Sequence, residues 1–253
     1  MNPVEGALVK RLDLIAELTD EDREALAALP ITLRSVEAGT DIVEEGQRIR
    51  DCCLLLSGFT HRYRTLLEGK RQIIAFHVPG DIPDLHSLHI NVMDHSFAAT
   101  VNCELAFIPH EAIWQLCTER PAVAAALWRE TLIDGSIFRE WIVGLGRRTG
   151  LQRTAHLLCE MAMRLRAMGH SDGLRYHLPL TQNVLADALG LTVVTVNRVL
   201  QELRQADYVE RERSRMTIHN WPALARLAEF DGGYLHMRQP PNMSVEMRPE
   251  DAI

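Results

Sequence analysis

The segment that most constrains the fold of this chain spans residues 180–200 and reads LTQNVLADALGLTVVTVNRVL. Gly190 divides it into two short amphipathic halves, because glycine adopts the left-handed conformation that ends a helix at little cost. Thr181 and Thr192 each precede one half, where a threonine hydroxyl can accept a backbone N–H of the first helical turn. The segment therefore predicts two helices joined by a tight turn.

The second predicted helix separates apolar from polar positions. Its inward stripe consists of Val196, Val199, Leu200 and Leu203. The outward and flanking positions are Val193, Val194, Asn197, Arg198 and Gln201. A helix of small residues, a glycine turn and a second helix that presents polar and arginine side chains form the helix-turn-helix pattern. An ordinary helical hairpin inside another domain is the alternative.

The residues that follow favour the helix-turn-helix. Residues 207–219 read DYVERERSRMTIH, which predicts two short strands joined by a charged turn. A strand pair in this position is a wing. Charge agrees with this interpretation: the whole chain carries −7, yet residues 147–219 carry a net +4 and residues 1–146 a net −9. Positive charge is thus concentrated where DNA phosphates would be met, and we predict DNA binding.

The first half of the chain has a different character. Residues 10–29 predict short helices, the second capped by Thr19 ahead of Asp22. Residues 31–108 alternate in short apolar runs separated by glycines. The strands we predict are Thr32–Val36, Asp41–Val43, Cys52–Leu56, Thr60–Leu66, Ile73–His77 and Phe97–Ile108. This rhythm indicates an antiparallel barrel or roll.

Two helices are predicted next, one from Pro109 through Cys117 and a long one from Pro121 to about Gly146, because proline is favoured at the first helical position. Apolar residues of the long helix cover more than half of its circumference, whereas a helix exposed on a monomer needs a single apolar stripe. We therefore predict a homodimer; a wholly internal helix is the alternative. The glycines at 144, 146 and 150 predict a hinge.

Several classes of protein are disfavoured. The five cysteines include no CxxC pair, which argues against a disulfide framework or a zinc knuckle. We find no nucleophile elbow, no phosphate-binding glycine loop and no HExxH, so we do not expect an enzyme. No apolar run approaches the roughly 20 residues of a membrane span, and the first residues show no signal segment, so we expect a cytoplasmic protein without membrane association.

Together these features resemble the CRP/FNR superfamily of bacterial transcription regulators over about residues 10–220. The stretches that carry the resemblance are VEAGTDIVEEG (36–46), LLLSG (54–58), PGD (79–81) and GLTVVTVNR (190–198). The resemblance implies an α+β fold with a jelly-roll-like sensor roll, a long dimerisation helix and a winged helix-turn-helix. The domains we expect are residues 1–120, 121–146 and 147–237, with a disordered tail at 238–253.

The resemblance also implies a set of DNA-contacting residues. Arg198 matches the family's recognition-helix arginine, which can grip guanine O6 and N7. Gln182, Thr192 and Thr195 match positions that meet phosphates, and Val193 and Asn197 complete the expected surface. Val194 departs from the family's usual glutamate, so we expect a thymine methyl contact and a shifted operator sequence.

The sensor residues depart further. Asp84 stands where cyclic-nucleotide-binding members have a ribose-binding glutamate, and His95-Ser96 stands where they have an Arg-Ser pair for the phosphate. Neutral histidine is a poor substitute for guanidinium, and Pro83 removes a backbone donor, so we do not expect cyclic AMP as the natural ligand.

The cysteine and histidine positions bear on the cofactors of the related sensors. No cysteine precedes Cys52, which disfavours the N-terminal iron–sulfur cluster of the oxygen-sensing branch. His86 lies near the haem ligand of the carbon-monoxide-sensing branch, which makes haem a candidate, but Asp84 replaces the accompanying cysteine. We expect purified protein to lack haem absorbance. The effector-binding candidates are Asp84, His86, His95 and Ser96.

A metal site is a further alternative for this loop. Asp84, His86, His89, Asp94 and His95 fall within twelve residues and offer ligands suited to zinc, nickel or iron. A polar loop whose histidines bond locally explains them as well, and we predict no metal site.

Two functions follow from the sequence. The first is a dimeric regulator that reads a palindromic operator under the control of an unidentified effector, with double-stranded DNA and RNA polymerase as candidate partners. The alternative is a ligand-independent repressor whose roll is only structural.

Overall fold

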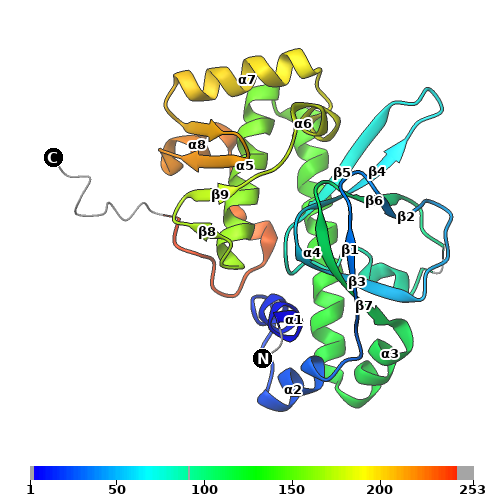
Figure 1. Ribbon diagram of the computed structural model, residues 1–253. Coiled ribbons are helices and arrows are strands. Elements are labelled where there is room, and N and C mark those ends of the chain that lie inside the picture. Colours follow the sequence, from blue (N-terminus) through cyan, green and yellow to red (C-terminus); the bar gives the residue numbers. More distant parts are fainter. Residues whose placement is uncertain (1–2, 91, 244–253) are drawn as a thin grey trace. The chain divides into compact units, whose positions relative to one another are not determined.

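The computed structural model describes residues 3–90 and 92–243 (Figure 1). The chain forms two compact units. Unit 1 extends to Trp141 and also takes in Tyr234–Arg238, whereas unit 2 comprises Ile142–Gly233 and the described residues after Arg238. Most of the expected disordered tail, residues 244–253, lies outside the described residues.

Unit 1 begins with two helices, α1 (Pro3–Asp13) and α2 (Asp20–Ala27). Thr19 caps α2 as predicted: its hydroxyl accepts the N–H of Asp22, and the Asp22 carboxylate accepts the N–H of Thr19. This reciprocal capping box satisfies two backbone donors that the first turn leaves unpaired.

The roll of unit 1 consists of two antiparallel sheets. One has the strand order β1-β7-β3 and the other β2-β6-β4-β5. Their bounds are β1 (Thr32–Val36), β2 (Asp41–Val43), β3 (Asp51–Ser57), β4 (Thr60–Thr65), β5 (Arg71–His77), β6 (Ser96–Ala99) and β7 (Cys103–Pro109). The predicted antiparallel roll is confirmed, and its strands follow the glycine rhythm.

Apolar side chains from both sheets meet in one core. The core cluster consists of Val43, Cys53, Leu55, Met93, Phe97, Ala99, Cys103, Leu105 and Phe107. Cys53 belongs to this cluster, whereas the sulfur of its neighbour Cys52 lies 3.7 Å from the Ser87 hydroxyl. The two cysteines thus face opposite sides of β3, as alternation along a strand requires. All five cysteines are free thiols.

One predicted strand was wrong in extent. The run Phe97–Ile108 is two strands, β6 and β7, separated by a turn at residues 100–102. The apolar alternation continues through Val101, so the sequence pattern does not show the break. Asn102 fixes it by accepting the N–H of Ala38 with its side-chain oxygen.

Gly58, between β3 and β4, makes close contact with this turn. Its φ is +92°, and a Cβ placed there would lie 2.5 Å from the backbone oxygen of Asn102. Gly69, in the β4–β5 turn, also has a positive φ of +77°, yet a Cβ there would meet nothing within 4 Å. Alanine substitutions at these two glycines therefore distinguish the cost of backbone strain from the cost of steric overlap.

We expect Gly58→Ala to lower the free energy of unfolding of unit 1 by about 2–4 kcal/mol, since left-handed strain and overpacking add. Gly69→Ala, which carries the strain alone, should cost about 1 kcal/mol. Urea unfolding followed by tryptophan fluorescence measures both, because three of the four tryptophans (Trp114, Trp128, Trp141) lie in unit 1. Equal costs for the two variants would contradict the steric argument.

Two helices follow the roll, α3 (His110–Glu119) and α4 (Pro121–Arg147), and the proline start predicted for α4 is confirmed. Inside unit 1, two buried arginines bind the first part of α4. Arg11 of α1 pairs with Glu130 at 2.8 Å, and Arg62 of β4 pairs with Asp134 at 2.6 Å. Gly144 and Gly146 lie inside α4, which continues to Arg147.

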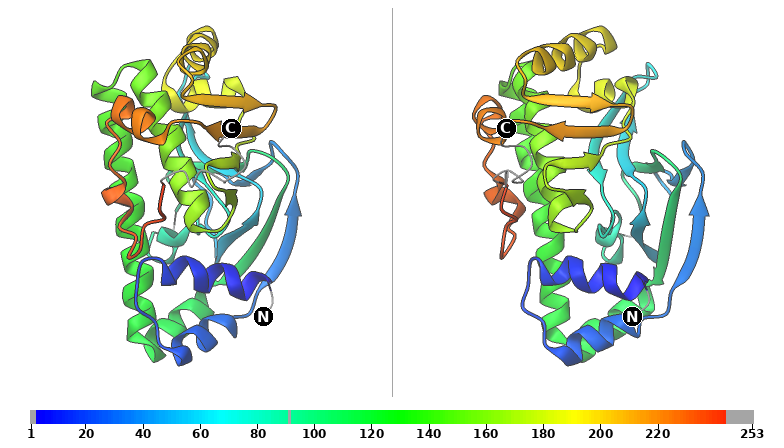
Figure 2. Two further views of the ribbon diagram at one scale, coloured as in Figure 1. Left: turned by 90° about the vertical axis from the view of Figure 1, so that its left-hand side faces the viewer. Right: turned by 60° about the vertical axis from the view of Figure 1, so that its left-hand side comes forward.

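Unit 2 starts within the last turns of α4 and continues with α5 (Gly150–Ala167), which Thr149 caps. A small sheet with the order β10-β11-β9-β8 packs with the helices of this unit (Figure 2). The remaining elements are β8 (Ser171–Asp172), β9 (Arg175–His177), α6 (Gln182–Leu189), α7 (Val193–Gln205), β10 (Val209–Glu212), β11 (Arg215–Ile218) and α8 (Trp221–Ala228). The short 3-10 helix η2 (Gly232–Leu235) begins in unit 2 and ends in unit 1.

Candidate functional site

Helices α6 and α7 have the geometry that the sequence predicted. Thr181 accepts the N–H of Val184, and Thr192 accepts the N–H of Thr195, each at 3.2 Å. Gly190 ends α6 with φ +59° and ψ +39°. Among the described residues no single helix is long and apolar enough to cross a membrane; only α6 and α7 together pass on length and composition, and this pair is bent by 100°. That bend falls within the range of a helix-turn-helix.

The first half of α7 presents the predicted contact residues to solvent. Val196, Val199 and Leu203 are buried and hold the helix against its unit. Thr192, Val193, Val194, Asn197 and Arg198 are exposed, whereas Thr195 and Gln182 are half-buried. Val194 is 79% exposed, so its apolar side chain is accessible to a ligand. Arg198 forms no hydrogen bond or ion pair with any other described residue, so its guanidinium is available to a ligand.

The predicted wing is present. Strands β10 and β11 pair antiparallel with Glu212 opposite Arg215, and Arg213-Ser214 forms the turn between them. Arg213 and Arg215 are exposed at the tip of this hairpin. Arg211, by contrast, folds back and donates to the backbone oxygens of Arg213 and Leu180.

The sensor candidates of unit 1 separate into two groups. Asp84 is 1% exposed, and its carboxylate accepts the N–H of Cys53 at 2.7 Å. Burial raises the pKa of Asp84 to about 7, although the Cys53 N–H and Arg62 oppose this shift. The hydroxyl of Ser96 accepts the N–H of Glu45 at 2.9 Å. Both residues are thus engaged in holding the roll together.

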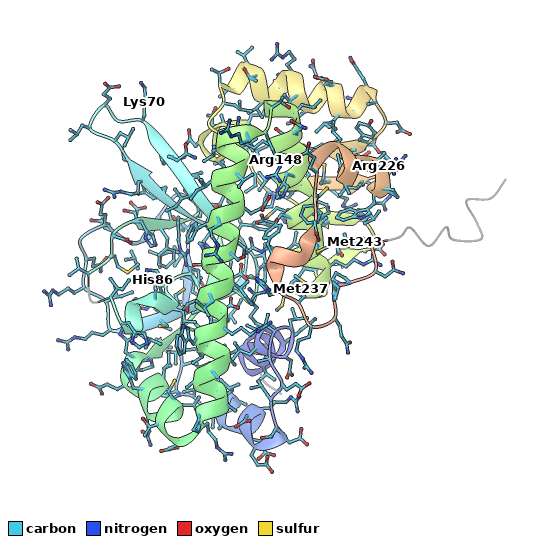
Figure 3. All side chains as sticks on the ribbon, turned by 180° about the vertical axis from the view of Figure 1, so that it is seen from behind. Lys70, His86, Arg148, Arg226, Met237 and Met243 are labelled. Carbon is cyan, nitrogen blue, oxygen red and sulfur yellow. The ribbon has the colours of Figure 1, made fainter. Side chains whose placement is uncertain are left out.

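His86 and His95, in contrast, lie together. His86 belongs to the 3-10 helix η1 (Leu85–Leu88), and His95 directly precedes β6. Their ring centroids are 5.1 Å apart, and Nδ1 of His95 lies 2.7 Å from a carboxylate oxygen of Asp94. Figure 3 labels His86 on the side of the roll that carries η1, close to α4. His89 points elsewhere, with its ring 4.8 Å from that of Trp114.

Comparison with known proteins gives the same division of the chain. Residues 33–120 match the cyclic nucleotide-binding domain family, and residues 152–227 match the Crp-like helix-turn-helix domain family. The chain is 29% identical over 219 residues to the transcriptional activator protein FnrL of Cereibacter sphaeroides, covering 83% of this chain and 86% of FnrL. This chain belongs to the CRP/FNR family of transcription regulators.

Two further relatives agree with the CRP/FNR assignment. The fumarate and nitrate reduction regulatory protein of Yersinia pestis is 24% identical over 223 residues, covering 87% of this chain and 88% of that protein. The structure of FixK2 from Bradyrhizobium japonicum matches with a TM-score of 0.72 and 25% identity, over 79% of this chain and 98% of FixK2. The predicted resemblance is confirmed: the chain is a DNA-binding transcription regulator, a non-enzymatic class.

Sequence reasoning for this CRP/FNR member missed the wing arginines. Arg213 and Arg215 are exposed on the same unit as α7, but were not among the predicted contacts. The signal for them was the charged turn of residues 211–215, which the sequence analysis used only to predict a wing. Their role depends on whether they lie at the hairpin tip, which a pattern of short strands does not specify.

Proposed function

We propose that this regulator acts as a homodimer that reads a palindromic operator, with α4 pairing against its copy and α7 entering the major groove. The observation that carries the proposal is the exposed apolar face of α4. Trp128 is 70% exposed, Leu132 59% and Ile142 67%. Large apolar side chains in such a row, left in water on one long helix, indicate a surface that a partner covers.

The spacing of these residues supports a second copy of the same helix as that partner. Positions 128, 132, 135, 139 and 142 alternate in steps of four and three, which is the seam of a left-handed coiled coil. Gly135 adds no side chain to the seam, but the Arg139 guanidinium lies beside it, 3.5 Å from where a Cβ of residue 135 would be. Arg139 therefore has to move to the edge of the seam when two helices pack. A two-fold axis beside α4 would make the contact self-complementary.

Two-fold symmetry supports an inverted-repeat operator. A dimer that places one α7 in each of two successive major grooves needs half-sites about 34–36 Å apart, or one helical turn. Within each half-site, Arg198 is proposed to read guanine and Val194 a thymine methyl. The contact would be completed by the half-buried Gln182, the exposed Asn197 and the N-terminal turn of α7.

The two threonines at the start of α7 retain a donor for phosphate. Their hydroxyls lie 2.9 Å apart, and that of Thr192 also accepts the Thr195 N–H. One hydroxyl hydrogen is used between them, so the other can be donated to a phosphate oxygen. The positive end of the α7 dipole adds to this attraction. Arg213 and Arg215 supply further phosphate contacts in this proposal.

Control of activity belongs to the proposal as well. We place the effector in the roll of unit 1, near His86 and His95, which the fold brings together. Several relatives are named transcriptional activators. RNA polymerase is therefore the further partner that we propose.

Selection of binding sites from randomised double-stranded DNA by the full-length protein tests the proposed function. We expect an inverted repeat whose half-site centres lie about 10–10.5 base pairs apart. Sedimentation of the selected complex should give two chains per duplex. A single non-repeated site bound by one chain would contradict the proposal.

A further inference from the structure

Three side chains of the roll form a cluster that DNA reading does not use. His86, Asp94 and His95 each offer one ligand atom, and these atoms all lie within 4.8 Å of one another. The imidazoles come from separate elements, η1 and the residue before β6, and meet through the fold. The sequence pattern predicts a polar loop with locally bonded histidines, and the fold adds the proximity of these three ligand atoms.

Two nitrogens in this cluster are unsatisfied. Nε2 of His86 and Nε2 of His95 are buried and have no hydrogen-bond partner among the described residues. His95 as a whole is only 7% exposed. A buried polar atom without a partner costs about 1–3 kcal/mol, so a pair of them in one place indicates a group that belongs there.

Both imidazoles keep the lone pairs that a metal needs. Nδ1 of His95 lies 2.7 Å from the Asp94 carboxylate, so the neutral ring carries its hydrogen on Nδ1 and keeps the lone pair of the buried Nε2. Nε2 of His86 likewise meets no donor among the described residues. Neutral histidine is the form that binds metal ions.

The charges around the cluster are compatible with a cation. Arg62 is the nearby positive charge, but it is already paired with Asp134 and donates to the backbone oxygen of Pro83. Asp94 and Asp134 place two carboxylates against this one guanidinium, and both act on the histidines. These three side chains have a formal charge of −1, while Arg62 exerts the largest single charge effect on both rings.

We propose that His86, Asp94 and His95 form a binding site for a divalent first-row transition metal ion such as zinc or nickel. Two imidazole nitrogens and one carboxylate oxygen suit these ions, and three protein ligands leave at least one position for water or another small ligand. Ligands about 2.0–2.1 Å from a tetrahedral ion lie about 3.3 Å apart, so the cluster has to contract on binding. The Asp94 side chain, 74% exposed, has room to make this movement.

An ion bound at this site would affect α4 through Arg62. Asp134 of α4 is bonded to Arg62, and Arg62 also faces both histidines. Its guanidinium lies 5.4 Å from the ring centre of Phe138, the next turn of α4. The positive charge of a bound ion would repel Arg62 and so weaken its ion pair with Asp134 and its contact with Phe138. The link from metal to DNA affinity rests on the proposed function, whereas the metal site itself does not.

Isothermal titration of Zn²⁺ and Ni²⁺ into tag-free, metal-stripped full-length protein tests the site. We expect one ion per chain, and we expect His86→Ala and His95→Ala each to weaken binding by more than about 100-fold, beyond the 10–100-fold typical of outer partners. Asp94→Asn preserves shape at an exposed position and should weaken binding by about tenfold or more. His89→Ala is the matched control: it removes a nearby exposed histidine and should leave affinity within about twofold.

Different failures lead to different conclusions. Absence of saturable binding, or equal binding by wild type and Asp94→Asn, overturns the site; far-UV circular dichroism of the metal-free variants confirms that they are folded. Operator affinity with and without the metal tests its regulatory role, for which we expect a change of about tenfold that His86→Ala abolishes. Metal binding without this change overturns the regulatory role, and lack of operator binding in every state overturns the proposed function instead.

Discussion

Leu132→Asp is expected to convert the regulator from a dimer to a monomer and to reduce operator affinity by about 100-fold or more. Leu132 belongs to the proposed α4 seam and is 59% exposed in the single chain. In a symmetric dimer each substitution removes a buried leucine, worth about 2–5 kcal/mol, and brings two like charges together. Loss of the dimer removes the avidity of two linked recognition helices, which is worth a factor of about 10²–10⁴.

The matched control is Leu67→Asp. Leu67 lies in the β4–β5 hairpin turn and is fully exposed, so the same substitution there adds the same charge without removing a contact. Sedimentation velocity and fluorescence anisotropy with labelled operator measure the two effects separately. If Leu132→Asp remains dimeric, the seam is not the interface. If it is monomeric yet binds the operator as tightly as wild type, recognition of two half-sites by a dimer is wrong.

Local signals in the sequence were sufficient for the DNA-binding part of the fold. The caps Thr181 and Thr192 and the turn at Gly190 act within a few residues, so their pattern determines where α6 and α7 begin and end. The strands of the roll were predictable for the same reason. The break inside residues 97–108 was not, because it depends on contacts of Asn102 with Ala38 and Gly58, which are distant from it in sequence.

The glycines near the end of α4 do not themselves end the helix, although its end lies close to the predicted one. Gly144 and Gly146 interrupt the apolar pattern, yet the helix continues through both, since isolated glycines weaken a helix by only about 1 kcal/mol each. The end comes after Arg147, where Thr149 starts α5 with its own capping box. The capping box at Thr149 starts a new helix and so fixes where α4 ends, which the glycines alone do not determine.

The sensor site was the least predictable part. The four candidates were chosen by alignment to a family pattern, and the structure brings only His86 and His95 together, with Asp94 beside them. Asp84 is turned toward the N–H of Cys53, and Ser96 toward that of Glu45. Which of several polar residues in one loop face each other is decided by tertiary packing, and no spacing rule contains that information.

Arg198→Ala is expected to abolish the preference for the selected operator while the dimer persists. Arg198 is exposed, forms no bond with another described residue and lies near the start of α7. A bidentate contact to guanine contributes about 1–3 kcal/mol of discrimination, and a dimer has two, so operator affinity should fall by about 30-fold to 10⁴-fold. Affinity for unrelated DNA should change far less, because phosphate contacts dominate it. Anisotropy titrations with operator and scrambled duplexes give both values.

Arg204→Ala provides the matched control, since it removes an exposed arginine from the last turn of the same helix. Arg198→Lys keeps the charge but lacks the planar fork, so it should lose specificity as well if guanine is read. The decisive comparison replaces the contacted guanine by 7-deazaguanine, which lacks only the N7 acceptor. This change should weaken wild type by about tenfold and leave the affinity of Arg198→Ala unaltered, because the arginine that used N7 is already absent. Equal weakening of both proteins would assign guanine recognition to another residue.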